Sequence, residues 1–289
     1  MQTERWTSEK LRSLDTITPP NFAVPEHAVD CHMHVFGANE LYPGSPEARY
    51  TLPEGSVEQY HALAKVLRLK KAVLVQPSYY GSDNSCLLDA MTRFGRPCRG
   101  VVFLPDRPTP PLIENFHGKG VRGIRLDFFK AAPEDAPRLL SDAAGIAKDV
   151  GWHIELYSPG SVIVTLLDRL AALDIDFSVN HMGYMKQDDT SDADFARFVA
   201  LARAPHCWVK LTGPYRIASD AERARTDAMA RALIEATPER LVWGTDWPHL
   251  PYGSRDTGEL LNRFAEWCPD EATRHNILVR NPSRLYDFD

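Results

Sequence analysis

A chain of 289 residues with 44% hydrophobic content can bury one large core or two modest ones without disulfide support. Its formal net charge of -6 at pH 7 argues against a nucleic-acid-binding protein, because no basic excess attracts a polyanion. The five cysteines form no CxxC pair, so we expect reduced thiols in a cytoplasmic protein rather than a disulfide framework.

Along the chain, short apolar segments alternate with longer amphipathic ones. We expect a polar leader over residues 1–27, with no signal peptide and no membrane span. The runs rich in β-branched or aromatic residues predict eight strands, at 28–34, 71–78, 99–105, 121–127, 152–158, 176–183, 207–213 and 241–247. Capping-box pairs, Ser56 with Gln59 and Ser219 with Glu222, predict the starts of two of the intervening helices.

The predicted strands are almost continuously apolar, which is typical of a parallel sheet covered on both faces. Eight β/α units in about 250 residues favour a (β/α)8 TIM barrel, forming a single domain over 28–289. A doubly wound open sheet is the alternative.

Seven of the eight predicted strands end in polar residues. In a (β/α)8 barrel the active site lies at these C-terminal strand ends. A single buried histidine there would be explained by an internal hydrogen bond, but seven polar ends together predict a site. The set comprises His32 and His34, Ser78, Arg125, Tyr157, His181, Arg216 and Asp246.

Two chemistries suit this set. His32 and His34 on one strand, completed by His181 and Asp246, supply ligands for one zinc or manganese ion. In the metal-free alternative, Asp246 takes a proton from water as general base, while histidines and an arginine donate hydrogen bonds to the carbonyl oxygen. Both alternatives predict hydrolysis, or a related addition, at a carbonyl group.

The segments DCHMHVFG, GVRGIRL, NHMG, WGTDWPH and NPSRLY occur in this order between about residues 29 and 286. Together they resemble the amidohydrolase superfamily, family 2, in the branch that contains 2-pyrone-4,6-dicarboxylate lactonase. The resemblance implies that Asp246 carries the proton, and that His32, His34 and His181 polarise a lactone carbonyl directly or through one metal ion. It also implies that the substrate is bound by Tyr50, Ser78, Arg125, Tyr157 and Arg216. We add Lys130 and His249 to these substrate-binding residues.

One departure from that branch concerns substrate choice. Lys130 is followed by Ala131, where the resemblance leads us to expect an arginine, so one anion-binding group is lost. This favours a related acidic lactone, such as a sulfomuconolactone or a sugar-acid lactone, over the pyrone dicarboxylate. The strand with Arg125 offers no lysine to bridge two metals, so at most one metal ion is expected.

Other outcomes remain open in the sequence. The same residue set also suits a lactone isomerase, a zinc-dependent decarboxylase, or a barrel that binds a ligand without chemistry. The expected partner is a small acidic lactone, with no nucleic acid and no membrane, and the oligomeric state is undetermined. Four aromatic residues are expected to be exposed in loops, as a lid or as loop packing: Tyr79, Tyr80, Tyr184 and Tyr252.

Overall fold

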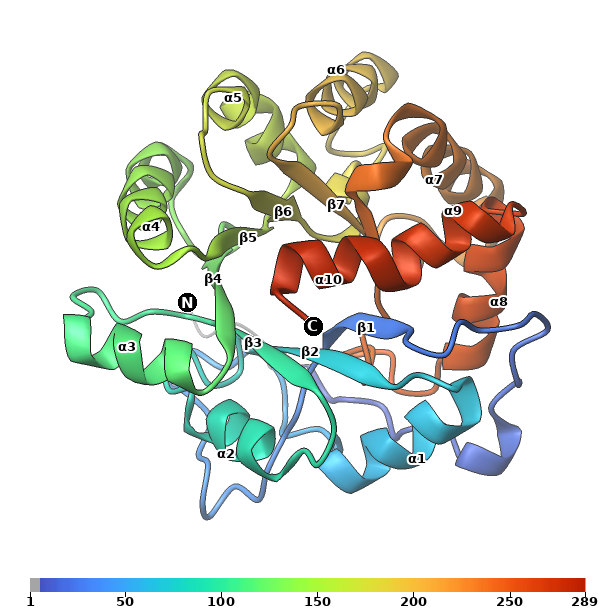
Figure 1. Ribbon diagram of the computed structural model, residues 1–289, viewed down its shortest axis with the longest axis horizontal. Helices are drawn as coiled ribbons and strands as arrows, with labels where there is room; N and C mark the ends of the chain where they lie inside the picture. Colours follow the sequence, from blue (N-terminus) through green and yellow to red (C-terminus); the bar gives the residue numbers. More distant parts are fainter. Residues whose placement is uncertain (1–5, 289) are drawn as a thin grey trace. The chain divides into compact units, whose positions relative to one another are not determined.

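The computed structural model describes residues 6–288, and its strands and helices alternate along the chain (Figure 1). Eight strands form one sheet in the order β1-β2-β3-β4-β5-β6-β7-β8. Their bounds are β1 Val29–Met33, β2 Lys71–Val75, β3 Cys98–Val102, β4 Val121–Asp127, β5 His153–Tyr157, β6 Phe177–Val179, β7 Cys207–Leu211 and β8 Leu241–Trp243. This arrangement confirms the (β/α)8 TIM-barrel fold class predicted from the sequence.

A helix follows each strand in the chain. The helices are α1 Val57–Leu67, α2 Ser85–Arg93, α3 Pro110–Gly118, α4 Ala136–Val150, α5 Gly160–Ala171, α6 Asp192–Ala202, α7 Arg223–Ala236, α8 Thr257–Trp267, α9 Glu271–His275 and α10 Asn281–Tyr286. Among residues 6–288, none of them has the length and apolar character that a membrane crossing needs.

The chain divides into two compact units, which we describe separately. Unit 1 comprises Met1–Val121 with Gly244–Glu266, and unit 2 comprises Arg122–Trp243 with Trp267–Asp289. In unit 1, the parallel strands β1, β2 and β3 pair in sequence. In unit 2, β4 through β8 pair in sequence, also in parallel.

Local sequence accounts for the helix boundaries. The Ser56 hydroxyl accepts from the Gln59 N–H at 3.3 Å, and the Gln59 side chain accepts from the Ser56 N–H at 2.9 Å, so the predicted capping box opens α1. Gly151 ends α4 in the left-handed region (φ 69°), which glycine adopts without steric cost. The pair of Ser219 and Glu222 instead opens a short 3-10 turn, and α7 begins just after it.

Every strand except β4 is shorter than its predicted range, and β6 and β8 fall short by the most. β6 ends at Val179 and β8 ends at Trp243, so His181 and Asp246 lie beyond the strands. Both residues have left-handed backbones, with φ of 50° and 61°, and such a conformation cannot continue an extended strand. The chain therefore turns sharply just before the residues predicted to be catalytic.

Residues 6–18 are hydrogen bonded to loops of unit 1. The Trp6 N–H donates to the carbonyl of Arg49 at 2.8 Å, and the Thr18 hydroxyl donates to Asp256 at 2.7 Å. Three of the four aromatic residues expected to be exposed are buried, namely Tyr79, Tyr80 and Tyr184. Only Tyr252, 41% exposed, matches that expectation.

Candidate active site

A carboxylate and two imidazoles meet inside unit 1. Asp246 Oδ1 lies 3.7 Å from His32 Nε2 and 3.8 Å from His34 Nε2. All three residues are buried, and one ligand atom from each lies within 4.8 Å of the others, so the group could hold a metal ion. The sequence prediction that these three residues lie together is therefore met within one unit.

The backbone around them explains this proximity. His32 lies in β1 and His34 comes directly after its last residue, Met33, so the alternation of an extended chain brings both side chains to one side. The Asp246 N–H donates to the His32 carbonyl at 2.7 Å, and the His34 N–H donates to the Trp247 carbonyl at 2.8 Å. These two bonds hold the segment after β8 against the end of β1.

The ring orientation of His34 is set by the backbone of β2. Its Nδ1 lies 2.8 Å from the Val75 carbonyl, which can only accept, so Nδ1 carries the proton. In the neutral ring, Nε2 then presents a lone pair toward Asp246. A backbone carbonyl that fixes the tautomer in this way is a common partner of metal-binding histidines.

A second buried carboxylate, that of Asp30, lies beside this group. Asp30 Oδ1 accepts from the N–H groups of His32 at 3.1 Å and Thr245 at 2.8 Å. Its Oδ2 accepts from the hydroxyls of Tyr60 at 3.0 Å and Thr245 at 2.7 Å. Burial raises the pKa of Asp30 to about 6, and the four hydrogen bonds oppose that rise.

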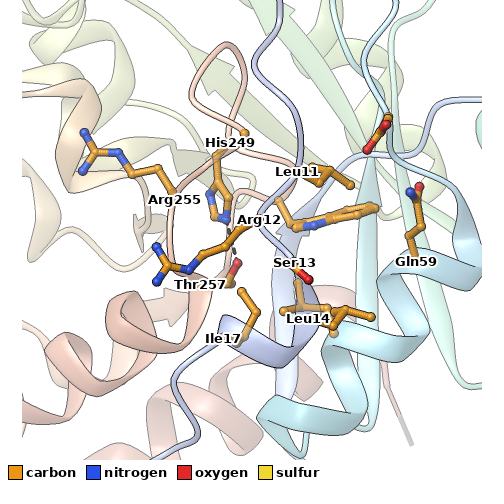
Figure 2. A pocket seen from close by; sticks show the side chains of 13 residues that line it. Leu11, Arg12, Ser13, Leu14, Ile17, Gln59, His249, Arg255 and Thr257 are labelled. Carbon is orange, nitrogen blue, oxygen red and sulfur yellow. Dashed lines mark hydrogen bonds between the residues drawn. The ribbon is translucent and has the colours of Figure 1, made fainter.

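The remaining predicted residues of unit 1 are more scattered. His249 Nε2 lies 2.8 Å from the Thr257 hydroxyl, and both residues line a cavity of about 240 Å³ together with residues 11–14 and Ile17 (Figure 2). Tyr50 is half-buried and its ring packs 5.4 Å from that of Tyr79, while Ser78 is half-buried at the loop that follows β2. The backbone joins His249 to the site, because the His249 N–H donates to the Asp246 carbonyl at 2.7 Å.

In unit 2, the buried residues His181 and Tyr184 form an aromatic group with the half-buried Tyr157. The His181 ring centroid lies 6.1 Å from that of Tyr157 and 5.4 Å from that of Tyr184. His181 Nδ1 lies 2.8 Å from the Thr212 hydroxyl, which fixes the ring's rotation. The Nδ1 edge of His181 is thereby committed to Thr212.

Cations lie close to Tyr157. The Arg125 guanidinium lies 4.7 Å from the centre of its ring, within the range of a cation–π contact. Burial raises the pKa of Tyr157, while the charges of Arg216 and Arg125 lower it. Arg216, at the end of a 3-10 turn after β7, is half-buried, as is Lys130, which follows β4.

Unit 2 also contains a buried ion pair, between Lys210 and Glu155. The Lys210 ammonium donates to Glu155 Oε2, and the Asn180 amide donates to Glu155 Oε1 at 2.9 Å. Burial alone would raise the pKa of Glu155, but the charges of Lys210 and Arg125 outweigh it and hold the pKa at about 2. Glu155 therefore stays ionised, and its negative charge offsets part of the positive charge of Lys210 and Arg125.

Sequence reasoning missed Asp30, Thr245, Thr212 and Lys210 as members of the polar network. For Asp30 a signal was present, because an aspartate two residues before His32 in an apolar strand shares its face and must find buried partners. The hydroxyls of the two threonines carried no such signal.

Comparison with known proteins adds relatives of named activity. Residues 29–288 match the family model described as amidohydrolase. A 4-sulfomuconolactone hydrolase from Hydrogenophaga intermedia is 34% identical over 278 residues, covering 93% of this chain and 92% of that protein. A 2-pyrone-4,6-dicarboxylate hydrolase from Comamonas testosteroni is also 34% identical, with 92% of each chain covered. A solved structure of a probable 2-pyrone-4,6-dicarboxylic acid hydrolase from Acinetobacter baumannii, with citric acid bound, is 25% identical, with a TM-score of 0.78 over 91% of this chain and 100% of that chain.

Proposed function

Because this chain belongs to the amidohydrolase family, we propose that it hydrolyses the ring ester of a small lactone bearing at least one acidic group. The observation that carries the proposal is the buried Asp246 carboxylate, 3.7 and 3.8 Å from the Nε2 atoms of His32 and His34. Two relatives that align over more than nine-tenths of the chain are named as hydrolases of acidic lactones.

In the proposed reaction Asp246 is the general base. Its carboxylate takes a proton from water, the resulting hydroxide adds to the lactone carbonyl carbon, and the ring C–O bond breaks. The same proton then passes from Asp246 to the leaving oxygen, so the product is a hydroxy acid and the base is regenerated. His32, His34 and His181 are proposed to stabilise the negative charge that develops on the carbonyl oxygen.

The three residues of unit 1 fit one divalent cation. Ligands about 2.0–2.1 Å from a tetrahedral zinc ion lie roughly 3.4 Å apart, close to the separations of 3.7 and 3.8 Å between Asp246 Oδ1 and the two imidazoles. We propose that His32, His34 and Asp246 hold zinc or manganese, with His181 as the further ligand suggested by the sequence. When bound, the ion would supply Lewis-acid activation of the carbonyl.

The tautomer of His34 favours the metal-bound alternative. A neutral ring whose proton is on Nδ1 offers a lone pair at Nε2, which can bind a cation but cannot donate to a carbonyl oxygen. The metal-free alternative therefore requires His34 as an imidazolium, paired with Asp246.

Arginines are proposed to bind the acidic groups of the substrate. Arg125 and Arg216 both act on the environment of Tyr157, and a guanidinium binds a carboxylate or sulfonate through two parallel N–H groups. Lys130 is proposed as a further cation, with Tyr50, Ser78, Tyr157 and His249 as polar contacts. Since Ala131 stands where the family resemblance leads us to expect a basic residue, we propose a preference for a sulfomuconolactone or a sugar-acid lactone over a pyrone dicarboxylate.

The proposal is tested with a panel of lactones that carry zero, one or two anionic groups, using acid release as the readout. We expect turnover of anionic lactones only, and a loss of about 10²–10⁴-fold in kcat for Asp246→Asn. Asp174→Asn, at an exposed ion pair with Lys148, is the matched control and should keep full activity. Turnover of uncharged lactones alone, or an active Asp246→Asn variant, would contradict the proposal.

The same assay separates the alternative reactions. Hydrolysis in ¹⁸O-labelled water places one label in the product, whereas isomerisation places none and decarboxylation releases carbon dioxide. Dialysis against a chelator followed by zinc or manganese addition distinguishes the two modes of carbonyl activation.

A further inference from the structure

The backbone of Asp246 is held in an unfavourable conformation. Its φ of 61° lies in the left-handed region, where the Cβ comes close to the following carbonyl oxygen. Such a conformation persists only where the surrounding structure determines it strongly. In unit 1, the neighbours of Asp246 in the chain are accordingly bound on both sides.

Asp30 supplies that restraint. Its Oδ1 joins the N–H groups of His32 and Thr245, so one carboxylate oxygen bridges β1 and the segment just before Asp246. Its Oδ2 accepts the Thr245 hydroxyl at 2.7 Å, and that hydroxyl accepts the Trp247 N–H at 3.0 Å. A continuous chain of hydrogen bonds thus runs from Asp30 to the residues on both sides of Asp246.

The close approach of the two segments is built into the sequence. A Cβ at Gly244 would lie 2.5 Å from the His32 nitrogen and 3.1 Å from Asp30 Oδ1. Only glycine lets the backbones come near enough for the shared carboxylate oxygen to reach both N–H groups. The remaining donor, the Tyr60 hydroxyl, comes from α1 and is not part of the connection to Asp246.

We infer that Asp30, acting through Thr245, is the positioning residue that fixes the Asp246 carboxylate against the imidazoles of His32 and His34. It does not touch the reacting atoms. Its action on turnover rests on the proposed role of Asp246 as the base, whereas its action on the position of Asp246 does not.

Two variants remove one hydroxyl donor each from the same oxygen of Asp30. Thr245→Val cuts the connection to Trp247, while Tyr60→Phe leaves it whole and keeps the ring that packs 5.6 Å from Trp247. Each variant should be less stable to unfolding than the wild type, since each loses a buried hydrogen bond to a carboxylate. Their effects on Asp246 should differ.

Crystal structures of the variants provide the first readout. In Thr245→Val we expect the Asp246 carboxylate to move by more than about 0.5 Å relative to the two imidazoles, and in Tyr60→Phe to stay in place. Thr245→Ser, which keeps the hydroxyl, should restore the position. An unmoved Asp246 in Thr245→Val, or an equal movement in Tyr60→Phe, would overturn the inference.

Kinetics with the lactone that the wild type opens fastest provide the second readout. Misplacement of a base by about 1 Å can cost on the order of 100-fold, so Thr245→Val should lower kcat about 10- to 100-fold with KM nearly unchanged. Thr245→Ser should recover most of this loss, and Tyr60→Phe should keep the wild-type kcat. Asp30→Asn should lower kcat as Thr245→Val does. If Asp30→Asn does not fold, Thr245→Val alone tests the role of Asp30. If the wild type opens no acidic lactone, the proposed function fails, and the crystal structures still decide the role of Asp30.

Discussion

Replacing Lys210 by methionine tests whether the buried ion pair of unit 2 is essential to the fold. Lys210 and Glu155 are both fully buried, and the ammonium donates to one carboxylate oxygen while Asn180 donates to the other. Lys210→Met leaves Glu155 buried with the Asn180 amide and the charge of Arg125, whose effect on the pKa of Glu155 is smaller than that of Lys210. Breaking a buried pair by removing one partner costs about 3–5 kcal/mol, because the remaining charge is uncompensated.

That loss is a large part of the total stability, which for a typical protein is about 5–15 kcal/mol. Since Arg125 still acts on Glu155, we expect a value near the lower end, about 3 kcal/mol, for Lys210→Met. Urea unfolding at pH 7, followed by fluorescence and circular dichroism together, measures it. The double variant Lys210→Met with Glu155→Gln removes both charges.

The double variant should lose less unfolding free energy than the two single variants lose together, by at least about 2 kcal/mol, since no isolated charge remains in it. Additive losses would refute the reasoning, because they would mean that the two charges do not compensate each other. A loss below about 1 kcal/mol for Lys210→Met would refute it as well.

Two further predictions concern β4 and β5. Burial lowers the pKa of His153 from 6.5 to about 4, so the unfolded chain binds the proton more readily than the folded chain does. The free energy of unfolding should therefore hold its full value above pH 6.5 and fall by about 3 kcal/mol as the pH decreases toward 4. His153→Asn, whose amide can replace the Nδ1 donor to the Arg122 carbonyl, should flatten the pH dependence of the unfolding free energy in this window, and an unchanged slope would contradict the assignment. Gly123→Ala should destabilise by about 1–3 kcal/mol in calorimetry, because its Cβ would lie 2.6 Å from the His153 ring. The control Gly145→Ala, in α4 with nothing within 4 Å of the added carbon, should instead stabilise by about 0.5–1 kcal/mol, and equal effects at the two glycines would show that the ring contact does not matter.

The sequence predicted the strands well because their pattern is local. β4 occupies the predicted range of 121–127, and the other seven strands lie within a residue or a few of their predicted bounds. The errors at β6 and β8 also have a local cause. An apolar run predicts where a strand begins, but the left-handed turns at His181 and Asp246 depend on hydrogen bonds from other segments.

The site was predictable in part for the same reason. His32 and His34 are two residues apart at the end of β1, the second just beyond the strand, so their common side could be predicted from the alternation of an extended chain. The partners of Asp30 are different, because Thr245 is 215 residues away and Tyr60 lies on a helix. The contact of His249 with Thr257 likewise depends on the turn that begins at Asp246, and spacing from the motif could not reveal it.

Three fully buried carboxylates show why one of them suits proton transfer. Glu155 is held by an ammonium and an amide, and Asp30 accepts four hydrogen bonds, so both have their oxygens committed to donors. Asp246 Oδ1 instead faces two imidazole nitrogens, at 3.7 and 3.8 Å, beyond hydrogen-bond length. These separations are close to those between ligands of one divalent cation, and the two imidazoles offer nitrogen ligands beside the carboxylate. The difference between a structural and a reactive carboxylate in this protein therefore lies in the partners of its oxygens, because burial is the same for all three.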